Sequence, residues 1–398
     1  MLPGANVQNP GDCWQLLQVT TFLRTQQGRE YFAQGGNMST ASQVKMLNAI
    51  DNKFVWVAPV VAASLYPVFL MGLFQSGELI RSATDSVEAI VGTVALVLSL
   101  LLSYGVPATG FAVAYRLGQI QDPSQSQIRV RRLVHLVFAS PPLFTCIGVI
   151  LFVLGITNNT DYLIWAIIWI PIVVLTFRSR AIGTRMVFSP VVNWQRLKGF
   201  RAVHGISALL ILLIYLVPHI ANHLTAIWNV DTHLWVMDSL RQWYRTDVIE
   251  PIVGVMFICQ VLTGLILWRP RTTHQSDLFG TLQTTSGAFL MVFITSHTMA
   301  VFLLARPNGV DTNFLWASGQ PAGLMGDPWN VRLIPHYTLA VWMLFTHLAC
   351  GLRFRLLDQN VAIAKADRLA WLMIGLGAVI SLIIILSMLG VHLNNSTV

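Results

Sequence analysis

The sequence predicts an all-α polytopic membrane protein with about nine transmembrane helices. Of its 398 residues, 55% are hydrophobic and only 11% are charged, whereas a soluble domain carries about 25% charge. The apolar residues gather in runs of roughly 17–25 residues, each long enough for a helix to cross the hydrocarbon layer. The runs lie near 54–75, 89–116, 132–156, 161–178, 204–228, 248–268, 284–304, 336–357 and 369–392.

The basic residues predict the orientation of these helices. Twenty of the 25 Lys and Arg residues fall in the N-terminal tail and in the connections near 117–131 (with the flanking Arg116 and Arg132), 178–203, 269–283 and 353–368. The segments on the other side hold five: Arg81, Arg241, Arg245, Arg306 and Arg332. Cytoplasmic segments are enriched in Lys and Arg, so the N-terminus is expected inside and the C-terminus outside. This bias also accounts for the net charge of +8, which is therefore no evidence for nucleic-acid binding.

The chain divides into four parts. Residues 1–53 are expected at the cytoplasmic side, either as a helix on the membrane surface or as a loosely ordered tail. Residues 54–178 form a four-helix membrane region, and residues 179–203 form a basic cytoplasmic connection. Residues 204–398 form a five-helix membrane domain that holds nine of the ten histidines.

His219 and His297 are predicted to lie at matching depths on two helices that run in the same direction. His219 lies fifteen residues beyond His204, and His297 lies thirteen residues into its own span. At 1.5 Å per residue these separations correspond to ~22 Å and ~20 Å, which places both residues in the outer half of the membrane. Ionisable side chains at such depths are costly and usually face a partner, a cavity or a metal.

His347 and Gln260 lie at corresponding depths, nearer mid-membrane, on the two spans that run the other way. Each is followed four residues later by a glycine, Gly351 and Gly264 respectively. Residues four positions apart share a helix face. A glycine there lets a second helix or a flat ligand approach the backbone.

Two interpretations of the His219–His297 pair are open. Two neutral imidazoles on separate helices can be the axial ligands of a six-coordinate haem iron, which needs no cysteine and suits an apolar interior. Alternatively, the histidines hydrogen-bond one helix to another, as polar residues in membrane bundles do. The four cysteines have no CxxC spacing and offer neither a zinc nor an iron–sulfur site.

His204 is expected to be interfacial, because it lies at the inner end of its predicted span. It stands three residues after Arg201. At this position the two residues are candidates to contact a quinone headgroup.

Residues 201–392 resemble the five-helix cytochrome b membrane anchor of succinate:quinone oxidoreductases and fumarate reductases. The resemblance covers about half of the chain, and the N-terminal four-helix region has no counterpart in it. The matching features are Arg201-x-x-His204, His219 followed by Asn222, Ser286-Gly287 before His297, Asp311-Thr-Asn313-Phe314, and His347-x-x-x-Gly351.

The resemblance implies a site for b haems. Four histidines bind two b haems in that family, and His219 and His297 match its outer pair. His347 matches one member of the inner pair, whereas Gln260 occupies the place of the other. Because glutamine is a poor iron ligand, the inner site is expected to be empty, to hold a haem through His347 alone, or to recruit another group. Another departure is Thr284, where the family tends to carry an arginine near a haem propionate.

The resulting functional prediction is a haem b-binding electron-transfer subunit that exchanges electrons with a quinone. Its partners would be flavoprotein, iron–sulfur or other respiratory subunits in the bacterial inner membrane or an equivalent energy-transducing membrane. The chain itself has no flavin or dinucleotide fingerprint and no predicted catalytic residue. The alternative is a structural or assembly subunit of a larger respiratory complex, with haem partly or wholly lost. A transporter or channel is favoured less, because the spans contain few acidic residues and no paired Gly/Pro-broken helices beyond Pro107 and Pro141-Pro142.

Overall fold

The apolar runs form helices in the computed structural model, which describes residues 53–120, 123–156, 160–178 and 194–394. Within these ranges all regular elements are helical. Seven helical stretches are long and apolar enough to cross a membrane, and two bent helix pairs bring the number to nine if each pair is one span. The all-α polytopic prediction is therefore confirmed. The N-terminal segment and most of the basic connection lie outside the described residues.

The front unit comprises the helices that precede the basic connection. They are α4 (Lys53–Ser64), α5 (Tyr66–Ser82), α6 (Ser86–Gly118), α7 (Gln125–Phe138), α8 (Ser140–Val153) and α9 (Thr160–Arg178). The α4–α5 pair is bent by 49° and the α7–α8 pair by 70°. Pro67 lies at the start of α5, and Pro141 and Pro142 at the start of α8. Proline lacks an N–H and clashes with the carbonyl four residues earlier, so neither pair continues straight.

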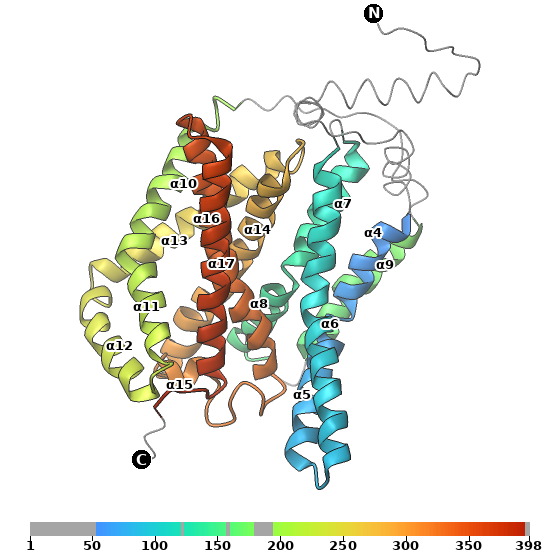
Figure 1. Ribbon diagram of the computed structural model, residues 1–398, viewed down its shortest axis with the longest axis vertical. Coiled ribbons are helices and arrows are strands. Elements are labelled where there is room, and N and C mark those ends of the chain that lie inside the picture. Colours follow the sequence, from blue (N-terminus) through green and yellow to red (C-terminus); the bar gives the residue numbers. More distant parts are fainter. Residues whose placement is uncertain (1–52, 121–122, 157–159, 179–193, 395–398) are drawn as a thin grey trace, which may run out of the picture.

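The back unit comprises the helices that follow the connection. They are α10 (Lys198–Ile211), the π-helix η1 (Leu212–Leu216), α11 (Val217–Thr225), α12 (Val230–Tyr244), α13 (Ile249–Arg271), α14 (Leu278–Met299), the π-helix η2 (Ala300–Ala305), α15 (Phe314–Ala317), α16 (Leu333–Asp358) and α17 (Ile363–Met388). Figure 1 shows α14 between the rest of this unit and the front unit. We call the end of the bundle with Lys198 and Asp358 proximal and the opposite end distal.

Helix α14 joins the two units along its length. It packs against α8, α6 and α7 on the front side and against α16 and α13 on the back side. Phe289 on α14 is fully buried, and its ring meets that of Phe138 edge-on with centroids 5.9 Å apart. The helix that bears His297 is thus also the central wall of the molecule.

A buried ion pair connects the units at the distal end. Arg332, just before α16, lies 2.5 Å from the Asp161 carboxylate of α9. Both side chains are buried, and the guanidinium also lies 4.4 Å from the centre of the Phe144 ring. Removing either charge would leave the other buried and uncompensated, which typically costs about 3–5 kcal/mol.

Helix α12 occupies a segment that the sequence analysis assigned to an outer connection. Its N-terminus is capped by Asn229, whose side chain accepts a hydrogen bond from the Thr232 backbone N–H (2.7 Å). One face buries His233 and Met237, whereas Trp235 on another face is exposed. A short amphipathic helix with exposed tryptophan is typical of a membrane–water interface.

Candidate functional site

The two predicted axial histidines lie beside π-helical turns. η1 ends two residues before Pro218, and His219 follows that proline on α11. η2 begins three residues after His297 on α14. A π-turn rotates the residues that follow it relative to a regular helix, and such turns are frequent at functional sites. The sequence analysis did not predict either π-turn.

The structure brings His219 and His297 together. Their ring centroids lie 6.5 Å apart, and the ring planes cross at 65°. Because a metal–imidazole bond is about 2.0–2.1 Å long and the ring nitrogen lies about 1.1 Å from the ring centre, imidazoles on opposite sides of one metal have centroids about 6.3 Å apart. The observed separation therefore fits a pair of axial ligands.

Neighbouring aromatic rings hold both imidazoles in place. Tyr215, one turn before His219, stacks on its ring with centroids 4.9 Å apart and an interplanar angle of 19°. Phe293 stacks in the same way on His297, at 5.3 Å and 11°. Stacking restricts rotation of the rings without occupying their nitrogens.

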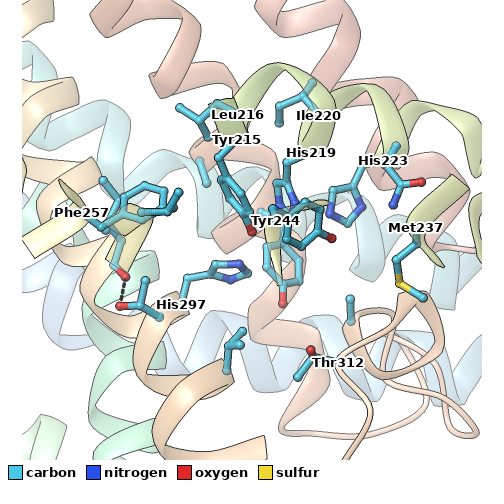
Figure 2. Close-up of a pocket in the computed structure, with 18 of the residues that line it drawn as sticks. Tyr215, Leu216, His219, Ile220, His223, Met237, Tyr244, Phe257, His297 and Thr312 are labelled. Carbon is cyan, nitrogen blue, oxygen red and sulfur yellow. Dashed lines mark hydrogen bonds between the residues drawn. The ribbon is translucent and has the colours of Figure 1, made fainter. Parts of the chain in front are cut away.

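A cavity of about 230 Å³ lies between these helices. Both histidines line it, and Figure 2 shows their rings extending into the same space from α11 and α14. Its wall is mostly aromatic and aliphatic, including Phe257, Leu290 and Leu344. Neither imidazole makes a hydrogen bond to any residue that the structure describes. Free imidazole nitrogens in an apolar cavity fit haem ligation better than they fit helix-to-helix hydrogen bonding.

Two further histidines, which the sequence analysis left without a role in the site, lie at the distal edge of this cavity. The His223 ring is 4.7 Å from that of His219, and the His233 ring is 5.3 Å from that of His223. Asn222 hydrogen-bonds to Nε2 of His233 through its side-chain nitrogen (3.2 Å). Burial, together with the charge of Arg241, lowers the pKa of His233 to about 4. His233 is therefore neutral near pH 7 and can accept this bond.

A second imidazole pair lies nearer the proximal end, and its members are His204 and His347. The centroids are 6.3 Å apart, with an interplanar angle of 81°. Nδ1 of His347 lies 3.1 Å from the carbonyl oxygen of Gln283, which requires Nδ1 to be the donor. Nδ1 of His204 lies 2.9 Å from the Thr263 hydroxyl, which itself donates to the Cys259 carbonyl. Both rings are thus anchored through Nδ1–H, and these hydrogen bonds do not use Nε2 of either ring.

The sequence paired His347 with Gln260, and this geometry corrects that prediction. The Gln260 side-chain nitrogen donates to the His204 carbonyl oxygen (2.7 Å) and to the Ser207 hydroxyl (2.8 Å). It braces α13 against α10, while the ring that faces His347 is that of His204. Helix α10 begins at Lys198, six residues before the predicted span. His204 is therefore already almost two turns inside the helix.

The other proximal candidate, Arg201, is exposed on α10. Thr284 is buried in α14, and its hydroxyl donates to the Gly280 carbonyl (2.6 Å). Across the described ranges, no group of three or more His, Cys, Asp or Glu side chains is arranged to hold a metal ion. The two imidazole pairs are therefore the candidates for a metal-containing cofactor in this part of the chain, since a haem supplies four ligands of its own.

Comparisons of the chain with models of known protein families, with curated proteins and with solved structures found no match.

Proposed function

We propose that this chain is a haem b-binding electron-transfer subunit, with His219 and His297 as the axial ligands. The observation that carries the proposal is the separation of 6.5 Å between two imidazoles that face one cavity. Neither ring is engaged in a hydrogen bond within the described chain. The resemblance of residues 201–392 to the cytochrome b anchors supports the same two residues.

The residues of the chain have distinct roles in this proposal. His219 and His297 hold the iron, and Tyr215 and Phe293 fix the orientation of their rings by stacking. The apolar wall keeps water away from the ligands, and together with bis-imidazole ligation it sets the reduction potential. A bound haem b supplies one-electron chemistry.

The proposed exchange partners are a quinone and the redox subunits of a respiratory complex. The chain carries no flavin or dinucleotide motif, so another subunit must supply or remove electrons. The distribution of Lys and Arg supports an arrangement with the proximal end at the cytoplasmic face. Arg201 and His204 lie at that end and remain the candidates for contact with a quinone headgroup.

The decisive measurement is a dithionite-reduced spectrum of the purified protein after haem-supplemented expression, combined with a pyridine haemochromogen assay. We expect a b-type α band and one haem per chain. Absence of any b-type band from folded protein would rule the proposal out.

The alternative is a structural or assembly subunit of a larger respiratory complex. Gln260 favours it, because a side chain used to brace two helices is not available as an iron ligand. Purification of the intact complex separates the two proposals. Co-purifying subunits without a b-type spectrum would support the structural role.

A further inference from the structure

Arg245, at the end of α12, is a half-buried cation on the wall of the distal cavity. Its guanidinium donates a hydrogen bond to the Thr312 hydroxyl (2.7 Å). No carboxylate oxygen of the described chain lies within 4.0 Å of the Arg245 guanidinium, so Arg245 forms no ion pair there. A partly buried guanidinium beside an apolar cavity is costly unless an anion compensates it.

The neighbouring arginines differ from Arg245 in this respect. Arg241, one turn earlier on α12, pairs with Asp311 (2.7 Å) and Asp238 (3.6 Å). Arg306, which also lines the cavity, is bound by both carboxylate oxygens of Glu250, at 2.5 and 3.1 Å. Arg245 is thus the lining arginine that makes no ion pair within the described chain, and the Glu250 carboxylate acts on its charge only from beyond ion-pair distance.

Ring contacts connect Tyr244, the residue before Arg245, to the predicted axial ligand. Tyr244, the preceding residue, packs edge-on against Tyr215 with centroids 5.4 Å apart. Tyr215 in turn stacks on His219. Arg245 and His219 line the same cavity, so a single ligand can reach both.

We propose that Arg245 binds a carboxylate of the ligand in the distal cavity, and that this carboxylate is a propionate of haem b. The inference rests on the proposed function, because it takes haem b to be the ligand. The propionates are the ionised groups of that cofactor, and the planar guanidinium matches a carboxylate with two parallel hydrogen bonds. The Thr312 hydroxyl holds the guanidinium in place from the outer loop.

The test compares two porphyrins that differ only in charge. Haem-free protein is titrated with ferric haem b and with its dimethyl ester, in which both propionates are neutral, and binding is followed by the Soret band. We expect Arg245→Gln to weaken the binding of haem b by about tenfold or more, the usual effect of losing a hydrogen bond to a charged group. Binding of the dimethyl ester should be unchanged.

Arg241→Gln is the matched control, since it removes a cation from the same helix that does not line the cavity. If displacement of α12 weakens binding in this variant, it should weaken the binding of both porphyrins equally. An equal loss of both porphyrins in Arg245→Gln, or no loss of haem b, would overturn the assignment of Arg245. If the wild-type protein binds neither porphyrin, the haem proposal itself fails, and that result is distinct from a failure of the Arg245 assignment.

Discussion

The distal and proximal imidazole pairs have nearly the same spacing but different surroundings. The ring centroids are 6.5 Å apart for His219 and His297 and 6.3 Å apart for His204 and His347. The distal rings face a cavity and make no hydrogen bond to described residues. Both proximal rings are anchored through Nδ1.

The proximal pair is also packed more tightly. A methyl group added at Gly287 would lie 3.0 Å from Cε1 of His347. By contrast, one added at Gly254, on the wall of the distal cavity, would meet no atom within 4 Å. Spacing alone therefore does not define a haem site, because the macrocycle also needs room around the axis that joins its ligands.

The largest expected effect is loss of the haem spectrum on substitution of a histidine, and it distinguishes the distal pair from the proximal pair. His219→Ala and His297→Ala each remove one distal axial ligand, so we expect complete loss of the bis-imidazole b-type spectrum. His204→Ala and His347→Ala should retain it, with one haem per chain. Reduced spectra of the four variants, each normalised to folded protein, make the measurement. Loss in His347→Ala with retention in His219→Ala would assign the haem to the proximal pair instead.

The next largest effect is expected from substitutions that fill the space around each pair. Gly254→Phe places a ring in the distal cavity, and we expect haem content to fall several-fold. Gly254→Ala should retain haem and serves as the control for substitution at that site. Gly287→Ala should also retain haem, but displacement of His347 should destabilise the fold by about 1–3 kcal/mol, as overpacking does.

Haem-to-protein ratios and thermal unfolding in detergent measure both effects. Equal haem loss in Gly254→Phe and Gly287→Ala would contradict the difference in packing between the two pairs.

The smallest effect is a pH dependence at the distal end, through His233. Its folded-state pKa of about 4 lies below the value of about 6.5 expected for an unfolded histidine. Between these values the unfolded chain binds a proton that the folded chain does not, so the contribution of His233 to stability is lost as pH falls from about 6.5 towards 4. Protonation also removes the acceptor for Asn222.

We expect the Tm of the wild-type protein to fall between pH 7.5 and pH 5 by a few degrees more than that of His233→Gln. The comparison between the two proteins removes the contribution of all other titrating groups. Identical pH dependence would show that protonation of His233 does not affect the stability of this end.

The sequence could predict which residues share a level but not which residues face each other. Counting residues along regular helices placed His219 and His297 at one depth, and the structure brings their rings together. The same counting paired Gln260 with His347, because depth carries no information about the direction of a side chain around the helix axis. Predicting the contact between His204 and His347 would also have required the start of α10. Helix boundaries are poorly defined where the sequence changes gradually from polar to apolar.

Helix α12 was missed for a different reason, since its apolar content is too low for a membrane span. The signals were nevertheless present. Asn229 is a favourable N-cap, and His233, Met237 and Tyr244 recur at helical spacing on the face that lines the cavity. The π-turns η1 and η2 have no comparable sequence signal, apart from Pro218 two residues after the first.

The position of α14 makes the approach to the distal cavity one-sided. Its front side is covered by α6, α7 and α8, so a lipid-soluble molecule cannot reach His297 from that direction. Helices α10 and α13 instead present exposed apolar side chains, among them Leu209, Val255 and Ile258. If the chain exchanges electrons with an apolar carrier as proposed, α10 and α13 are an apolar surface across which that carrier could approach.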